Sequence, residues 1–355
     1  MILVVKNSRI PAALAFALSR MAFRFALVVL LCAASLAGAQ KKKGDQLEKP
    51  MAGPRATVLR VTWLYVAPDF GSQKIDKVQI GREMVAAEKS GPWMRVYANT
   101  DIEELHQDKD TPLIGGDQTP PPVSGWIQAK GVVEESTPNG DQILMGEAGN
   151  QESLASDPRG PVNAAKSARL LYTRIYEMFP NSPLVPEAEW RAADIKWQLE
   201  KADNSSLRSA HEKDPYMREQ MDEDALRKVI KLNPHSRWAD LAAFDLIDNK
   251  LCGDWQGTVQ CPQKESEIYE KYADEHPDGP RTAQALYQAV YRQAVLRDMF
   301  AANGDDKKSD SAKNHAHDLA ARLKDHFAAT DYAWRAGALV YKLDEGIPVY
   351  GIDRE

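Results

Sequence analysis

The sequence holds few of the patterns from which an enzyme is usually identified. It contains no H-E-x-x-H, no G-x-S-x-G and no G-x-x-x-x-G-K-[ST], so the usual zinc site, serine nucleophile and phosphate-binding loop are missing. Adjacent carboxylates such as Glu103 and Glu104 lie in a segment that is expected to be mobile, where nothing would hold them for acid–base chemistry. We therefore expect a protein that is not an enzyme and that needs no metal or cofactor.

Basic residues are in the minority. Lysine and arginine number 45 against 51 aspartates and glutamates, which gives a net charge of −6. Four of the basic residues and none of the acidic ones lie before Gln40, so removal of that segment leaves 41 against 51 and a net charge of −10. A general nucleic-acid-binding protein needs a basic surface to neutralise phosphates, and this class is therefore disfavoured.

The main apolar run, Phe25–Leu36, is also short. Its twelve residues are fewer than the roughly 20 that span a bilayer as a helix. An arginine precedes the run and Ala37-Gly38-Ala39 follows it, an order that is typical of a secretory signal peptide. We predict that residues 1–39 are an N-terminal extension and signal peptide, and that the mature protein is exported and is periplasmic or associated with the cell envelope.

Two details of this segment bear on its processing. Leu31 stands before Cys32, where a lipoprotein signal has a small residue, so a soluble exported protein is favoured over a lipid-anchored one. Met1 and Met21 are both plausible starts of translation.

Cysteine is scarce, with three in the chain. After Cys32 has left with the signal peptide, Cys252 and Cys261 remain as an even pair in an oxidising compartment. The competing interpretation is a metal-binding or nucleophilic pair, but no histidine lies nearby to serve either. We predict a disulfide that closes the short loop between them.

Residues 56–134 have the pattern of a small all-β barrel. Side chains alternate along residues 58–63 as in a strand, and further apolar segments at 84–87, 93–97, 125–127 and 131–133 are separated by glycine turns. Residues 40–55, before this barrel, are polar and are predicted to be a disordered linker.

The order of these segments resembles bacterial SH3-like (SH3b) domains. Leu64-x-Val66 stands near a proline, and Gly91-x-Trp93-x-x-Val96 and Gly125-Trp126-Ile127 follow a glycine turn. The resemblance implies contact with peptidoglycan or a peptide. The candidate contact residues are aromatic, and some of them must belong to the core: Tyr65, Trp93, Tyr97 and Trp126. Tyr65 and Tyr97 are the better candidates, because a phenol can lie at a wet boundary.

This domain departs from the SH3-like pattern in one place. Residues 99–124 are a long, acidic and proline-rich insertion where such domains have a short connection. Residues 135–160 then form a polar linker with several turn-forming dipeptides.

Residues 161–345 contain four helical hairpins in one register. The corners are residues 179–182, 233–236, 276–279 and 327–330, and they are 54, 43 and 51 residues apart. An apolar residue stands five positions before the second residue of each corner, and an alanine stands eight positions after it. These residues are predicted to pack between helices: Ile175, Ala188, Val229, Ala242, Tyr272, Ala285, Leu323 and Ala336.

The hairpins resemble tetratricopeptide-like repeats of the bacterial envelope type. The residues that carry the resemblance are Tyr176-Glu177-Met178-Phe179-Pro180-Asn181-Ser182. Outer-membrane assembly lipoproteins and periplasmic cell-division coordinators carry such repeats, and the resemblance implies a protein partner.

The expected fold is multidomain, a small all-β SH3-like barrel followed by an all-α array of helical hairpins, with a tail at 346–355. The expected function is that of a non-catalytic binding and scaffold protein. The alternative is a peptidoglycan hydrolase or an accessory factor of one. SH3-like domains often accompany a cysteine peptidase of that kind, which needs a free cysteine on a helix and a downstream histidine. Neither Cys252 nor Cys261 has that setting.

Overall fold

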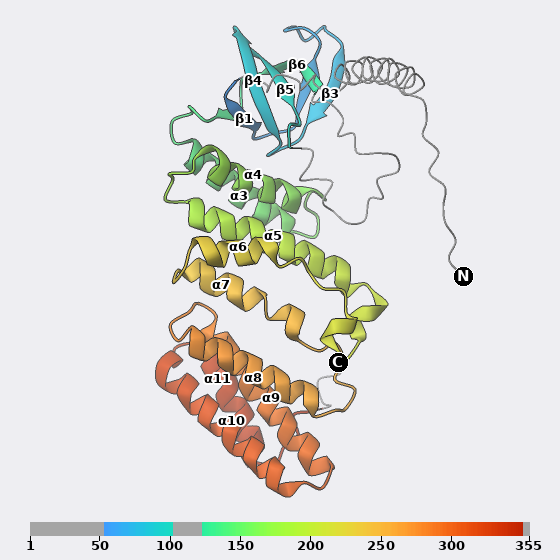
Figure 1. Ribbon diagram of the computed structural model, residues 1–355, viewed down its shortest axis with the longest axis vertical. Helices are drawn as coiled ribbons and strands as arrows, with labels where there is room; N and C mark the ends of the chain where they lie inside the picture. The colour runs from blue at the N-terminus through green and yellow to red at the C-terminus, as the bar shows by residue number, and fades with distance from the viewer. Residues whose placement is uncertain (1–52, 102–122, 351–355) are drawn as a thin grey trace, which may run out of the picture. The chain divides into compact units, whose positions relative to one another are not determined.

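The computed structural model describes residues 53–101 and 123–350 (Figure 1). The predicted signal peptide with Cys32, most of the predicted linker 40–55 and most of the insertion 99–124 lie outside the described residues.

Seven strands form one antiparallel sheet in the order β3-β2-β6-β5-β4-β1-β7. The strands are β1 (Arg55–Val58), β2 (Thr62–Tyr65), β3 (Lys74–Val78), β4 (Glu83–Ser90), β5 (Trp93–Ala98), β6 (Val123–Gln128) and β7 (Val132–Glu134). Leu64, Met84, Met94, Val96 and Ile127 are almost completely buried and form its core.

The single strand predicted over residues 58–63 is wrong. β1 ends at Val58 and β2 begins at Thr62, because β1 pairs with β4 and β7 whereas β2 pairs with β3 and β6. Alternating side chains indicate extended backbone but do not show where it bends to change partners. The sheet also begins inside the predicted linker, since the carbonyl of Pro54 already accepts a hydrogen bond from the backbone of Ala86.

Nine α-helices follow in the described part of the chain. They are α3 (Gly140–Ala155), α4 (Ala164–Met178), α5 (Val185–Ser205), α6 (Asp224–Leu232), α7 (Arg237–Asp245), α8 (Gln260–Glu275), α9 (Thr282–Ala302), α10 (Asp306–Phe327) and α11 (Asp331–Asp344). Short 3₁₀ turns lie between them at η2 (Arg208–His211), η3 (Pro215–Met217) and η4 (Asp248–Lys250).

The four predicted corners join helices as pairs: α4 with α5, α6 with α7, α8 with α9, and α10 with α11 (Figure 1). Their local chemistry explains where the second helices begin. Ser236 and Thr330 accept hydrogen bonds from the backbone of Ala239 and Ala333 and thereby cap α7 and α11. Each of the eight predicted packing positions is buried, with at most 4% of its surface exposed: Ile175, Ala188, Val229, Ala242, Tyr272, Ala285, Leu323 and Ala336.

The predicted linker 135–160 is instead largely helix α3. Leu144 and Ala148 are completely buried, and α3 packs along α4. The prediction failed because the buried apolar stripe of α3 consists only of Leu144 and Ala148, while Ile143 and Leu154 stay exposed, so the sequence shows no clear apolar helix face.

The sheet and the first helices share a hydrophobic core. Val133 of the sheet clusters with Leu144 and Leu171, and Leu59 packs against the same group. Gly81 has a φ of +80°, and a Cβ atom there would lie 2.7 Å from the Cβ of Leu170. The close approach of the sheet to α4 therefore requires glycine at this turn.

The predicted tail 346–355 is partly folded. Val349 is 4% exposed and belongs to the core of the last helices. The backbone N–H groups of Val349 and Tyr350 both donate to the carboxylate of Asp298 on α9. The folded chain thus extends at least five residues beyond the predicted boundary.

Candidate partner-binding surfaces

A cleft with a volume of about 130 Å³ lies where α4, α5 and α6 meet. Ala192, Ala193 and Val229 give it an apolar floor, and all three are buried. The edge carries positive charge: Arg169, Lys196 and Lys228. We call this the first cleft.

The cations of the first cleft are unequally neutralised. The Lys196 ammonium lies 2.6 Å from a carboxylate oxygen of Asp222. The Lys228 ammonium lies 5.9 Å from the centre of the Tyr176 ring. Arg169 and Lys228 have no carboxylate at ion-pair distance among the residues that the structure describes. Their charge is therefore available to a ligand.

The second cleft, of about 380 Å³, lies between α7 with the turn after it and α8. Its apolar lining comes from Leu246, Ile247, Ile268 and Tyr272, among others, and Lys250 and Lys271 stand at its edge. Lys250 has no ion-pair partner in the described ranges, whereas the Lys271 ammonium is 3.8 Å from Glu275 one turn further along the helix. An exposed pair at that distance contributes little, so Lys271 remains available.

One wall of the second cleft is fixed by hydrogen bonds. His276 Nδ1 lies 2.8 Å from a carboxylate oxygen of Asp240, and the Tyr272 hydroxyl donates to the Asp240 carbonyl at 2.9 Å. These bonds hold the end of α8 against α7 and so fix the position of this wall.

The sheet places its four candidate contact residues at different depths. Tyr65 and Trp93 are buried, and their rings pack edge-on with centres 5.4 Å apart. Tyr97 and Trp126 are half-buried. The expectation that Tyr65 lies at a wet boundary is corrected, because Phe70 covers it and Trp93 at centre distances of 6.2 and 4.9 Å.

Two exposed aromatic residues on the sheet were missed from the sequence. In the segment between β2 and β3, Phe70 is 63% exposed and Val66 is 57% exposed. Trp63 is 38% exposed, and the ammonium groups of Lys74 and Lys77 lie 4.7 and 4.6 Å from its ring centre. A phenylalanine between Asp69 and Gly71, inside a polar turn, was the available signal for Phe70.

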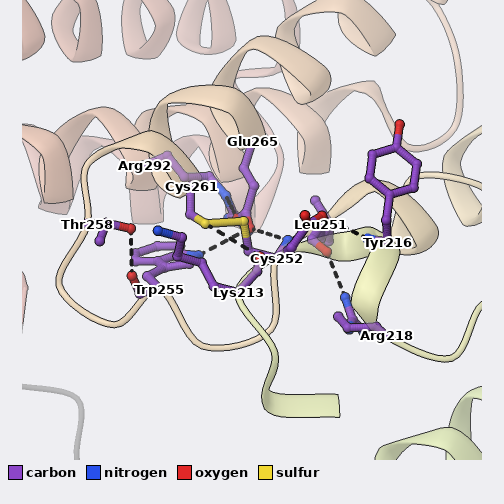
Figure 2. Close-up of a disulfide and its surroundings, with 11 residues drawn as sticks. Lys213, Tyr216, Arg218, Leu251, Cys252, Trp255, Thr258, Cys261, Glu265 and Arg292 are labelled. Carbon is purple, nitrogen blue, oxygen red and sulfur yellow. Dashed lines mark hydrogen bonds and ion pairs between the residues drawn. A yellow bond between two sulfur atoms is a disulfide. The ribbon is translucent and has the colours of Figure 1, made fainter. Parts of the chain in front are cut away.

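Cys252 and Cys261 are joined by a disulfide with a Cα–Cα distance of 6.0 Å. Figure 2 shows the carboxylate of Glu265 and the guanidinium of Arg292 beside it. Glu265 is 2% exposed and accepts hydrogen bonds from the Cys252 backbone (3.0 Å), the Trp255 indole (3.1 Å) and Arg292 (3.0 Å) (Figure 2). This carboxylate is fully engaged in holding the loop, which assigns the disulfide a structural role.

A buried ionic network connects the sheet to α4. The Arg174 guanidinium is completely buried and pairs with Asp101 at 3.0 Å, with Glu83 at 3.2 Å and with Glu177. Arg82 pairs with the same Asp101 at 2.7 Å. Glu83 belongs to β4, Asp101 follows β5, and Arg174 belongs to α4, so these pairs fix the sheet and α4 against each other.

Electrostatics are most perturbed between α5 and α7. Burial raises the pKa of Asp245 to about 7, and the negative charges of Asp194 and Asp248 act in the same direction. Burial also raises the pKa of Asp194. Neither Asp194 nor Asp245 lines either cleft.

Within residues 53–101 and 123–350, no group of three or more histidines, cysteines and carboxylates is arranged to hold a metal ion. The helices in the same ranges are all too short or too polar to cross a membrane. No protein-family model matches the chain, and no curated protein sequence is significantly similar to it.

Proposed function

We propose that this protein is an exported, non-catalytic binding and scaffold protein of the cell envelope. In this proposal the sheet is an SH3-like barrel that contacts peptidoglycan or a peptide, and the helix pairs are tetratricopeptide-like repeats that hold a protein partner. Export rests on the signal-peptide pattern before Gln40.

The observation that carries the proposal is the first cleft. Buried alanines and a valine form its apolar floor, and Arg169 and Lys228 at its edge are not neutralised within the described chain. Apolar surface bounded by a few positioned charges is the usual composition of a ligand site. The packing of α4, α5 and α6 does not need these charges.

Beside the sheet, the exposed residue Phe70 is the better candidate for the second contact. Phe70 rests on Tyr65 and Trp93, so a ligand that packs on it gains a rigid aromatic base. Since the sheet and α4 share a core and the Arg174 network, the two surfaces are held in one geometry rather than on a flexible tether.

Photo-crosslinking in cells tests the partner site. A photoreactive amino acid in place of Lys228 is expected to capture a protein, whereas the same amino acid in place of the exposed Lys324 on α10 is not. Equal capture at both positions, or none at either, contradicts a partner site in the first cleft.

Two assays on purified peptidoglycan test the rest of the proposal. Phe70→Ser is expected to reduce co-sedimentation of the protein with peptidoglycan without altering its fold, because Phe70 is largely exposed. Incubation of the wild-type protein with peptidoglycan is expected to release no fragments. Fragment release favours the alternative function of a hydrolase.

A further inference from the structure

The two clefts occupy equivalent positions in successive helix pairs. Counted from Pro180 and Pro234, the second residues of their corners, both clefts are lined by the residues nine, twelve, thirteen and sixteen positions later. Counted back from the next corner, Pro234 or Pro277, both are lined by the residues nine, six and five positions earlier. In the first cleft each set lies on one helix, α5 or α6, whereas in the second the first set runs from the end of α7 into η4. The two clefts thus occupy the same register positions.

The equivalent positions also carry the same chemistry. Sixteen positions after the corner stands a lysine in each cleft, Lys196 and Lys250. Six positions before the next corner stands another, Lys228 and Lys271. The floor positions between them are apolar in both: Ala192, Ala193 and Val229 in the first cleft, and Leu246, Ile247 and Tyr272 in the second.

The third junction, between α9 and α10, shows that stacking does not require the lysines. Its equivalent floor positions are all buried: Leu286, Ala289, Val290, Leu319 and Leu323. The first lysine position holds Gln293, which is buried and bonded to Ser266. The second holds Arg322, which pairs with Asp274 at 2.7 Å. The lysine pair is therefore a feature of the two junctions that carry the clefts and not of the third.

We propose that the two clefts together bind one extended acidic segment of a partner protein that carries two apolar side chains. This rests on the function proposed above and names the chemistry of the partner. Each apolar side chain packs on one floor, and carboxylates beside it pair with the edge cations, chiefly Lys228 with Arg169 in the first cleft and Lys250 with Lys271 in the second.

Charge complementarity argues for an acidic occupant. The chain as a whole carries a net charge of −6, so two sites with exposed lysines stand out against it. Each cleft has one carboxylate in its lining, Glu189 in the first and Glu275 in the second, and the cations outnumber it. They are Arg169, Lys196 and Lys228 in the first cleft and Lys250 and Lys271 in the second. A basic segment would meet uncompensated cations of its own sign.

The distance between the clefts sets the spacing of the apolar side chains. The first cleft lies at the α5–α6 boundary and the second at the α7–α8 boundary, so two helix widths, those of α6 and α7, separate them. Two such spacings amount to about 20 Å. An extended chain covers this distance in about six residues. Occupation of both clefts by one segment gains affinity, because the second contact forms at high effective concentration.

The test uses the full exported chain and a fluorescein-labelled acidic peptide whose two leucines lie about six residues apart. Binding measured by fluorescence anisotropy is expected to weaken as salt is added, since charge pairing at an exposed site is screened. One control peptide replaces both leucines by serine, and the other replaces the glutamates by lysine. Both are expected to bind about tenfold more weakly or worse.

Matched charge reversals locate the binding on the protein. Lys228→Glu and Lys271→Glu change exposed lysines at the same register position of the two clefts. Each is expected to lower the affinity for the acidic peptide by about tenfold. Lys324→Glu, an exposed lysine on α10 outside both clefts, is expected to leave it unchanged. Circular dichroism spectra that match the wild type show that the variants are folded.

Three results overturn the proposal. Equal binding by Lys228→Glu, Lys271→Glu and Lys324→Glu shows that the peptide lies elsewhere. If the leucine-free peptide binds as tightly as the leucine-containing one, the clefts recognise charge alone. The same conclusion follows if anionic phosphatidylglycerol vesicles displace the acidic peptide. Loss in only one of the two variants shows that a single cleft is used.

The photo-crosslinking at position 228 separates this failure from failure of the proposed function. If a partner is still captured there while the acidic peptide does not bind, the protein is a scaffold for a partner of other chemistry. If neither is observed, the scaffold function itself is contradicted.

Discussion

Asp245 is a residue whose ionisation depends strongly on the fold. Its pKa rises from 3.8 to about 7, chiefly because burial disfavours the charged form. Between about pH 4 and pH 7 the folded state holds a proton that the unfolded chain has released. The free energy of unfolding therefore decreases as the pH rises through this window. Above it the contribution of Asp245 no longer changes with pH, and the destabilisation stays at its full value.

We expect Asp245→Asn to remove the destabilisation that the buried charge of Asp245 causes at high pH. Each unit of pKa shift corresponds to about 1.4 kcal/mol, and partial relaxation of the site leaves a gain of about 1–3 kcal/mol in the free energy of unfolding at pH 8. Near pH 4 the substitution is expected to have little effect, because the carboxyl is then protonated in the folded protein. Urea unfolding at the two pH values measures the difference.

Asp318→Asn is the control, since Asp318 is exposed on α10. It is expected to change stability little at either pH. A gain from Asp245→Asn that is equal at pH 4 and pH 8 shows that ionisation is not its cause.

At the scale of elements, one contact register joins successive helix pairs. The residue ten positions after one corner meets the residue four positions after the next corner. At the first and third junctions the ring centres of Trp190 and Trp238 lie 5.4 Å apart and those of Tyr287 and Tyr332 lie 5.8 Å apart. At the second junction the Arg281 guanidinium lies 5.9 Å from the ring centre of Phe244. The corner spacing varies from 43 to 54 residues, yet the register is kept, because the extra residues lie away from the corners. In the 54-residue interval they include η2 and η3, and in the 51-residue interval they lengthen α9 and α10.

Ala242 tests the close packing that this register requires. It is completely buried on α7, so Ala242→Leu is expected to overpack the junction and lower the free energy of unfolding by about 1–3 kcal/mol. Ala301→Leu makes the same change at an exposed position of α9 and is expected to be nearly neutral. Chemical denaturation of both variants compares them. Equal stability of the two contradicts the burial of Ala242.

The disulfide tests the loop between η4 and α8. Replacement of Cys252 and Cys261 by serine is expected to cost about 2–3 kcal/mol in the chain-entropy description, because the loop that it closes is short. The helical circular dichroism signal is expected to persist, since the bond lies outside the helix cores. Unfolding of the wild type in reductant is expected to reproduce the loss, and two reactive thiols in the native protein without reductant would contradict the bond.

At the scale of the molecule, Arg174 decides whether the sheet and the helices behave as one body. Its removal leaves Asp101 and Glu83 buried with fewer counter-charges. Loss of one partner from a buried ion pair typically costs about 3–5 kcal/mol, and we expect Arg174→Met to fall in this range. Urea unfolding followed by tryptophan fluorescence measures it.

Arg159→Met is the matched control, because Arg159 is exposed. Hydrogen exchange adds a local readout: Arg174→Met is expected to speed exchange at the sheet–α4 boundary around Gly81. If both variants unfold alike, the network does not couple the two parts.

The sequence determined the local features of this protein. Proline- and serine-containing corners, the apolar residue before them and the alanine after them follow from helix geometry, so the four hairpins and all eight packing positions were predictable. The cysteine pair was predictable from its even number and short separation. The β content of residues 56–134 followed from alternation and glycine turns.

Only the tertiary structure decided how these pieces meet. The helical stripe of α3 is narrow enough to look like a linker until α4 is placed against it, and Tyr65 is buried because Phe70 folds over it. The first cleft combines residues up to 60 positions apart, from Arg169 to Val229, and no local pattern shows which side chains line a junction. Partners in a core or a cleft are selected by packing in space, whereas sequence periodicity specifies one helix or strand at a time.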